Sequence, residues 1–382
     1  MPSLRLHHAL LIISAMLVIT GIAMTFSTTV VAAASYGDPF KEVYKEIGAL
    51  SVGIFAAIVV AKARIERWLP FVTLLTTIGI AAIFVAKFFG PDINGANRWL
   101  PLGSALRVQP SEFVRVILPV YVALYLSERD EAVKAGKDIN KIPLLFIIPA
   151  TIGVIISPDL EGAILMALVG MIPLILAGLN WRLVTSMGIV GVAGTIAGLF
   201  FTGRAYRLER IKEWIGGGEE PITSQVMQGM MAINRGGLFG VGPGAGQSQW
   251  GRVPNRDTDF IYAVIGEEYG VVGALIIIAL FVGLLVIGYK LWKGHPTPFG
   301  RYAGLALAIG ISLQAFINMA SVVGVIPVTG LTLPLISTGG SSKVAVLCAL
   351  GLLYRLCTQW DSQNEMLPVP TPLTSIAEES DV

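Results

Sequence analysis

Long apolar runs separated by short charged segments constrain the fold of this 382-residue sequence more than any other feature. A membrane-spanning helix needs about 20 mainly apolar residues at a rise of about 1.5 Å per residue. Only 14% of the residues here are charged and 54% are hydrophobic. Because about a quarter of the residues in a soluble domain are charged, the sequence predicts an all-α polytopic membrane protein.

Ten segments satisfy the length criterion, so we expect ten transmembrane helices and both termini on the same side. They lie near residues 9–30, 47–62, 69–89, 111–127, 142–157, 162–178, 183–201, 260–290, 302–325 and 341–357. The first run resembles a signal peptide, but it has no clear cleavage site, and we interpret it as a retained span. Residues 1–360 would form the transmembrane domain, and the acidic residues 361–382 would form a disordered cytoplasmic tail.

The distribution of lysine and arginine predicts the orientation of these helices. With a cytoplasmic N-terminus, the cytoplasmic loops hold Lys62, Arg64, Arg67, Arg129, Lys134, Lys137, Lys141, Arg182, Lys290, Lys293 and Arg301. The exception is the basic segment 202–258 between the seventh and eighth helices, which approaches the length of about 60 residues at which the rule weakens. We interpret this segment as a large functional loop on the outer side.

Several kinds of site are disfavoured by the sequence. Cys348 and Cys357 are nine residues apart and face opposite sides of one predicted helix, which argues against a disulfide or a metal site. The three histidines fall near predicted cytoplasmic ends, which argues against a catalytic histidine. A nucleotide loop is also not expected, because Gln247 stands where the phosphate-binding lysine would have to follow Gly246.

Four polar clusters fall on the predicted outer side. In the first, Glu112 and Arg115 stand at i and i+3 at the start of the fourth predicted helix and are expected to pair. Ser111 is a candidate N-cap of that helix. Arg98 and Arg107 are candidate anion ligands, because ionisable groups at membrane segments are costly and usually functional.

The second and third clusters also combine carboxylates and arginines. In the tight turn 157–161, Asp159 is expected to pair with a neighbouring arginine such as Arg115. In the large loop, Arg207 and Arg210 form a basic stripe whose guanidinium forks suit phosphate oxygens. The alternative for this stripe is a solvated amphipathic helix with internal ion pairs.

The fourth cluster covers residues 327–343, where proline, glycine and hydroxyl side chains interrupt the apolar pattern. We expect a broken or re-entrant segment, which is tolerated at membrane depth only inside protein or along a wet cavity. Ser341, Ser342 and Lys343 at its end are candidate substrate ligands, with Lys343 near an anion at a helix N-terminus.

A glycine-rich stretch, residues 236–260, leads into the eighth predicted helix and carries the carboxylates of Asp257 and Asp259. Its glycines are expected to allow close backbone approach and positive φ angles. Together with the arginines, this stretch describes an outward-facing polar cavity that suits a lipid-linked phosphate substrate. Asp259 is then the candidate base that accepts a proton from a sugar hydroxyl.

These motifs together resemble the SEDS family of membrane peptidoglycan glycosyltransferases, the RodA, FtsW and SpoVE kind. The resemblance is carried by NGANRW…VQPSEFVR (94–115), SPDLEGA (157–163), the run from Gln225 and Gln228 through GGLFGVGPGAG to PNRDTDFIYAVIGEEYG (225–270) and PVTGLTLPLISTGGSSK (327–343). It implies a bacterial inner-membrane enzyme that polymerises lipid II, the disaccharide-pentapeptide carried on undecaprenyl diphosphate. It also implies a class B penicillin-binding protein and other divisome or elongasome membrane proteins as partners, and no nucleic acid or nucleotide.

By the same resemblance, Asp259 of the Thr258-Asp259-Phe260 motif is the catalytic carboxylate, with Thr258 and Asp257 beside it. Arginines and a divalent cation, Mg²⁺ or Mn²⁺, would stabilise the departing lipid diphosphate. The sequence departs from the family pattern at Asn255, where the family usually has glutamate, and at Glu161, where it usually has glycine. Residues 27–40 resemble the division branch slightly more than the elongation branch.

Two other functions share these features. A flippase for the lipid-linked precursor would also need a basic cavity, but one whose cations are reachable from both leaflets and that holds no catalytic base. A scaffold that only recruits a penicillin-binding protein would leave the arginines unexplained. Because the polar clusters gather on one predicted side, the sequence favours chemistry over translocation.

Overall fold

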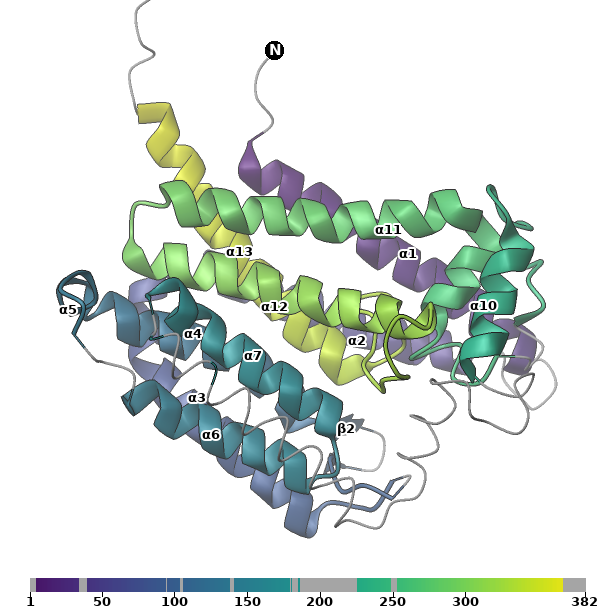
Figure 1. The fold of residues 1–382 in the computed structure, drawn as a ribbon, viewed down its shortest axis with the longest axis horizontal. Helices are drawn as coiled ribbons and strands as arrows, with labels where there is room; N and C mark the ends of the chain where they lie inside the picture. Colours follow the sequence, from purple (N-terminus) through teal and green to yellow (C-terminus); the bar gives the residue numbers. More distant parts are fainter. Residues whose placement is uncertain are drawn as a thin grey trace, which may run out of the picture.

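The computed structural model describes the chain apart from residues 1–4, 34–39, 94, 104–105, 138–140, 179, 181–184, 186–224, 249–252 and 367–382. The described part is a bundle of helices with one short strand pair (Figure 1). The helices are α1 (Leu6–Ala33), α2 (Lys41–Lys62), α3 (Ile65–Phe89), α4 (Pro110–Ser127), α5 (Asp130–Lys134), α6 (Lys141–Ile156), α7 (Leu160–Leu176), α10 (Gln225–Gly236), α11 (Ile261–Gly294), α12 (Pro298–Val322) and α13 (Gly340–Met366). Strands β1 (Leu100–Leu102) and β2 (Leu106–Val108) pair antiparallel.

Seven of the described helices are long and apolar enough to cross a membrane: α1, α2, α3, α4, α11, α12 and α13. Helices α6 and α7 are shorter apolar helices, and a tight turn joins them where the sequence predicted it. The expectation of a multi-pass, mainly helical membrane protein is therefore confirmed. The count of ten spans stays a prediction, because nearly all of the seventh predicted span, 183–201, lies outside the described residues, as do residues 202–224 and 249–252 of the large loop.

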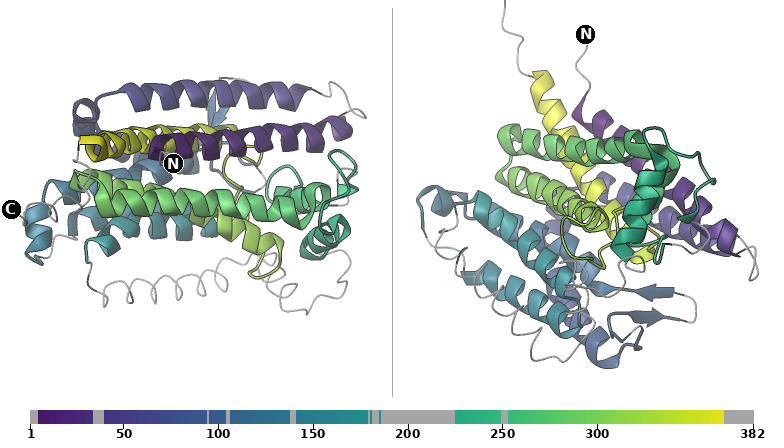
Figure 2. Two further views of the ribbon diagram at one scale, coloured as in Figure 1. Left: turned by 90° about the horizontal axis from the view of Figure 1, so that it is seen from above. Right: turned by 45° about the vertical axis from the view of Figure 1, so that its right-hand side comes forward.

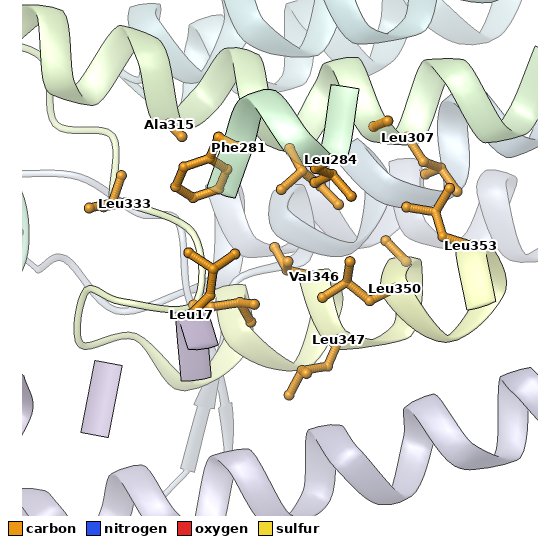
Figure 3. Close-up of a cluster of buried hydrophobic side chains, with 14 of the residues drawn as sticks. Leu17, Phe281, Leu284, Leu307, Ala315, Leu333, Val346, Leu347, Leu350 and Leu353 are labelled. Carbon is orange, nitrogen blue, oxygen red and sulfur yellow. The ribbon is translucent and has the colours of Figure 1, made fainter. Parts of the chain in front are cut away.

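The core lies where α1, α11, α12 and α13 meet. Phe281 of α11, Leu307 of α12 and Leu350 of α13 point toward one another, and Leu17 of α1 closes the cluster (Figure 3). Many outward side chains are large and apolar, such as Phe55 of α2, which is 69% exposed. Such exposure would destabilise a soluble protein, but lipid tails are as apolar as this core. The exposed faces of the helices therefore fit a bilayer.

Helix α2 lies along one side of the bundle and packs closely on α13 (Figure 2). Glycine makes this approach possible: a Cβ atom added at Gly351 would lie 2.4 Å from the carbonyl oxygen of Ala57. Near the start of both helices, this tight interface encloses an ion pair between Glu46 of α2 and Lys343 of α13, which are 6% and 1% exposed.

The two ends of the bundle differ. At one end, the Asp361 carboxylate of α13 accepts hydrogen bonds from the main-chain N–H groups of Leu6 and His7, at 2.9 and 3.0 Å, and so joins the start of α1 to the end of α13. Helix α13 continues to Met366, so the first residues of the expected tail are helical, and residues 367–382 lie outside the described chain. At the other end lie α10, the strand pair and the connection between α12 and α13 (Figure 1).

Candidate active site

Asp259 lies in a tight turn formed by residues 254–260, immediately before α11. The main-chain N–H groups of Thr258 and Phe260 both donate to the Asn255 carbonyl at 3.1 Å. Asn255 has φ +50°, a left-handed conformation that asparagine adopts more readily than most residues. Phe260, only 1% exposed, anchors the end of the turn in the core. The asparagine that departs from the family pattern is thus suited to the conformation of its turn.

Three consecutive main-chain carbonyls of this turn are each held by a different residue. The Asp257 carbonyl accepts from the Thr338 N–H and hydroxyl, both at 2.9 Å, and the Thr258 carbonyl accepts from the Ser337 hydroxyl at 2.5 Å. The Asp259 carbonyl accepts from the side-chain amide of Asn318 at 2.8 Å. These four hydrogen bonds hold the turn through its main chain.

The partners of the turn come mainly from the connection between α12 and α13, residues 323–339, which has no regular secondary structure. This connection is held from α12: Asn318 also donates to the Leu331 carbonyl at 2.7 Å, and Gln314 donates to the Thr332 carbonyl at 2.9 Å. The predicted broken segment is therefore present, and α12 side chains satisfy its Leu331 and Thr332 carbonyls.

The glycine-rich segment docks on a break in α11. Gly270 has φ +68° and interrupts the helix. The main-chain groups released by this break pair with residues 237–242. The Glu267 and Glu268 carbonyls accept from the N–H groups of Val241 and Gly242, at 3.0 and 3.1 Å. In the other direction, the N–H groups of Val271 and Val272 donate to the carbonyls of Gly237 and Leu238, at 3.0 and 3.2 Å. At Gly240, with φ +83°, an added Cβ atom would lie 2.1 Å from the Glu268 carbonyl oxygen. The expectation of close backbone approach at these glycines is confirmed.

A buried carboxylate completes this docking. Glu267 is fully buried and accepts from the Arg235 guanidinium at 2.6 Å and from the main-chain N–H groups of Gln247 and Ser248 at 2.9 and 3.0 Å. A buried charge of this kind is tolerated only when it is paired and hydrogen-bonded. Helix α10, the glycine-rich segment and the first part of α11 therefore form one connected support for the Asp259 turn.

Arg98 is an internal clamp in the described structure. Its guanidinium donates to the Ser157 carbonyl at 2.8 Å and to the Pro158 carbonyl, and lies 3.6 Å from the Asp159 carboxylate. The expected pairing of Asp159 with a neighbouring arginine is confirmed, but the partner is Arg98 and not Arg115, whose guanidinium is buried against Glu112 and Gln314. Asp159 also caps α7 by accepting from the Gly162 N–H at 2.9 Å.

The Glu112–Arg115 pair is confirmed, with 3.2 Å between Oε2 and Nη1. Arg115 also donates to Gln314 at 3.0 Å, which connects α4 to the same glutamine that holds the α12–α13 connection. The expectation that Ser111 caps α4 is wrong. Gln109 is the N-cap and Pro110 is the first helical residue, because proline at that position needs no hydrogen-bond acceptor for its nitrogen.

The other residues predicted to bind substrate have different surroundings in the structure. The Ser341 hydroxyl bridges to β2 and α4, since it donates to the Arg107 carbonyl and accepts from the Gln109 N–H, both at 3.2 Å. The Arg107 side chain is exposed, whereas Ser342 is buried. Lys343 pairs with Glu46 inside the protein. Arg207 and Arg210 lie outside the described residues.

The described residues offer no ready-made metal site. Within the ranges given above, no group of three or more histidine, cysteine, aspartate or glutamate side chains is arranged to hold an ion. Near the turn, the Asp257 carboxylate accepts from the Thr338 hydroxyl at a long 3.4 Å. A divalent cation at the site therefore stays a prediction.

Two residues central to the site, Gln314 and Asn318, were missed by reasoning from the sequence. Both lie in α12, are 3% and 0% exposed, and hold the α12–α13 connection. The sequence could have predicted them, because two amide side chains four residues apart in an otherwise apolar span lie on one face of the helix. Polar groups at such positions usually hydrogen-bond to other segments of the protein.

The sequence matches one family model and is similar to several curated proteins. The family model for FtsW, RodA and SpoVE, described as cell cycle protein, matches residues 7–361. A probable peptidoglycan glycosyltransferase FtsW from Alkalilimnicola ehrlichii is 33% identical over 353 residues, which cover 88% of this chain and 85% of the relative. The peptidoglycan glycosyltransferase MrdB of Escherichia coli K12 is 35% identical over 350 residues, which cover 90% of this chain and 92% of the relative.

Solved structures share the fold. A chain from a study of how a peptidoglycan synthase complex coordinates polymerization and crosslinking has a TM-score of 0.73 and 26% identity, covering 91% of this chain and 96% of that one. The rod shape determining protein RodA of Thermus thermophilus has a TM-score of 0.66 and 25% identity, covering 92% and 96%.

Proposed function

This chain belongs to the family of FtsW, RodA and SpoVE, and on that premise we propose that it is a peptidoglycan glycosyltransferase that polymerises lipid II with Asp259 as the catalytic base. Its curated relatives are named peptidoglycan glycosyltransferases. The proposal sets the end of the bundle that carries Asp259 on the outer face of the bacterial cytoplasmic membrane, with both chain termini in the cytoplasm. The excess of lysine and arginine in the opposite loops supports this orientation.

The observation that carries the proposal is the anchoring of the Asp257, Thr258 and Asp259 carbonyls by three different residues. A general base must be held within hydrogen-bond reach of the proton that it removes. Fixing the turn through its main-chain carbonyls fixes the position from which the Asp259 side chain projects.

In the proposed reaction, the 4-hydroxyl oxygen of an acceptor sugar attacks the anomeric carbon of a donor lipid II. The new bond joins that oxygen to the anomeric carbon, and the bond from this carbon to the diphosphate oxygen breaks. The hydroxyl proton passes to the Asp259 carboxylate, and the diphosphate leaves with its negative charge on the undecaprenyl carrier. Orientation of the two substrates supplies much of the rate enhancement in such a transfer.

The departing diphosphate needs positive charge near it. Arg107 is the candidate that the described structure supports best, because its guanidinium is exposed while its carbonyl is tied to Ser341. Arg207 and Arg210 remain candidates from the sequence. Arg98 is a weaker candidate, since its guanidinium already holds two carbonyls and a carboxylate. No step of the proposed mechanism is assigned to a divalent cation.

We further propose that the enzyme works beside a class B penicillin-binding protein, within the divisome or the elongasome. A solved structural neighbour comes from a peptidoglycan synthase complex, which supports such a partner. The relatives include proteins named FtsW and MrdB at similar identity. The weak sequence preference of residues 27–40 for the division branch therefore stays a prediction.

The experiment that tests the function separates synthesis from transport. The purified chain is reconstituted in vesicles with labelled lipid II, with and without its penicillin-binding partner, and glycan strands and transbilayer movement of lipid II are measured in the same samples. We expect glycan strands from the wild type and none from Asp259→Asn. Movement of lipid II without any strand formation, in wild type and variant alike, would instead identify a flippase.

A further inference from the structure

A cavity lined by polar and charged residues lies at the end of the bundle opposite Asp259. Its volume is about 440 Å³, and it is lined by the loop between α11 and α12 and by the last turns of α13, through Pro296, Thr297, Arg355, Thr358, Gln359, Ser362 and Gln363. The unbroken part of α11 after Gly270 lies between this end and the Asp259 turn, and its 24 residues, 271–294, correspond to roughly 36 Å. The cavity therefore takes no part in the chemistry at Asp259.

The cavity holds one fixed positive charge that the described protein leaves uncompensated. The Nε atom of Arg355 is buried and has no hydrogen-bond partner in the described part of the chain. The only acidic side chain described in α13 is Asp361, and its carboxylate is occupied by the N–H groups of Leu6 and His7 and by the His7 ring at 2.5 Å. No acidic residue lines the cavity.

Other lining groups restrict which atoms can bind a ligand. The Thr358 hydroxyl donates to the Arg355 carbonyl at 2.7 Å, and the Ser362 hydroxyl donates to the Thr358 carbonyl at 2.8 Å, so both hydroxyl protons are used within α13. The Thr297 hydroxyl contacts the His295 ring at 3.2 Å, which leaves Arg355 and the side-chain amides of Gln359 and Gln363 as donors among the lining residues. Arg355 is the charged residue of this lining, so the cavity favours an anion.

We propose that this cavity binds a phosphate group, held by Arg355. A guanidinium fork matches phosphate oxygens in geometry and charge. A volume of about 440 Å³ is within the usual range for small-molecule sites and exceeds the needs of a bare phosphate ion, which leaves room for a phosphate ester. The phosphate comes either from a lipid headgroup, since basic pockets between transmembrane helices bind anionic headgroups, or from a soluble phosphate ester.

The test uses the purified full chain, stripped of lipid in detergent, with native mass spectrometry as the readout. The probes are phosphatidylglycerol, which carries the phosphate, and diacylglycerol, which has the same tails without it. We expect wild type to bind phosphatidylglycerol about tenfold more tightly than Arg355→Gln does. Arg64→Gln is the matched control, because Arg64 is an exposed arginine at the same end of the bundle, and its affinity should stay within about twofold of wild type.

A second variant guards against misfolding of Arg355→Gln. Gln363 is exposed, so Gln363→Ala should leave the melting temperature unchanged and still weaken binding by about threefold. Competition by glycerol 3-phosphate would identify a soluble ester as the ligand, and binding that resists it would identify the lipid headgroup. Equal affinities of Arg355→Gln and Arg64→Gln, or equal binding of diacylglycerol and phosphatidylglycerol, would overturn the proposal.

Discussion

The buried ion pair between Lys343 and Glu46 decides whether Lys343 is a substrate ligand, as its sequence position suggested, or a structural residue. The two side chains are 1% and 6% exposed and contact each other across the α2–α13 interface. We perturb the pair with Lys343→Met and Glu46→Leu, singly and together. Each single substitution leaves one charge buried without its partner, whereas the double substitution leaves an apolar contact of similar volume.

The expected magnitudes follow from this burial. Removal of one partner of a buried ion pair typically costs about 3–5 kcal/mol, whereas replacement of both by apolar groups is often neutral. Each single variant should therefore lose about 3–5 kcal/mol in the free energy of unfolding, and the double variant less than about 2 kcal/mol. The Glu42–Lys45 pair is the control, because its side chains are 51% and 59% exposed, and its loss should cost less than about 1 kcal/mol.

Two measurements are made on the same four proteins. Unfolding by SDS titration in mixed micelles gives the free energies, and synthesis of glycan from labelled lipid II gives the activity. We expect the double variant to regain most of the wild-type stability and activity. A double variant no more stable than the singles would refute the reasoning from burial. A stable but inactive double variant would indicate that Lys343 binds substrate.

Further predictions concern other parts of the support for Asp259 and the opposite end of the bundle. Asn318→Leu removes the amide that donates to the Asp259 and Leu331 carbonyls. The variant should lose about 2 kcal/mol in the free energy of unfolding, and its rate of glycan synthesis should fall about 100-fold. Gly240→Ala should cost at least about 3 kcal/mol because its Cβ meets a carbonyl, whereas Gly244→Ala meets no atom within 4 Å and should cost only about 1–2 kcal/mol. Burial lowers the pKa of His295 in the folded protein below its ordinary value of 6.5. As the pH falls below about 6.5, His295 is therefore protonated in the unfolded chain before it is protonated in the folded one, which favours unfolding. The melting temperature should therefore fall there, and fall less in His295→Gln. EDTA should leave the melting temperature unchanged, since no described cluster of three ligands awaits a cation; a drop of several degrees would reveal a structural ion.

The sequence predicted the helices, the non-helical connection and the close glycine contacts, all of which depend on the residues of one local segment. Apolar length identified nine helices that the structure describes, and the interrupted pattern at 327–343 predicted a non-helical connection. The glycines of residues 236–246 predicted close backbone approach, which Gly240 makes against α11. These predictions succeed because chain length, glycine and proline act on the backbone wherever the segment packs.

Pairings between distant segments could not be predicted in the same way. Arg98, rather than Arg115, pairs with Asp159, because the side of α4 that carries Arg115 faces the bundle core. Lys343 meets Glu46, and these residues are 297 positions apart in the sequence. A helix face determines which side chains project together, but only the packing of two helices determines which charge each will meet. Buried polar side chains such as Asn318 are for this reason the least predictable part of the site.

The most direct test of the account compares two neighbouring aspartates in one assay. Purified wild type, Asp259→Asn and Asp257→Asn are each incubated with labelled lipid II and the penicillin-binding partner, and initial rates of glycan synthesis are measured. Asp257 is held mainly through its carbonyl, which asparagine retains, so Asp257→Asn should keep most of the wild-type rate. Asp259→Asn should fall to background while its melting temperature stays unchanged. Glycan synthesis by Asp259→Asn at a rate near that of Asp257→Asn would contradict the assignment of Asp259 as the base.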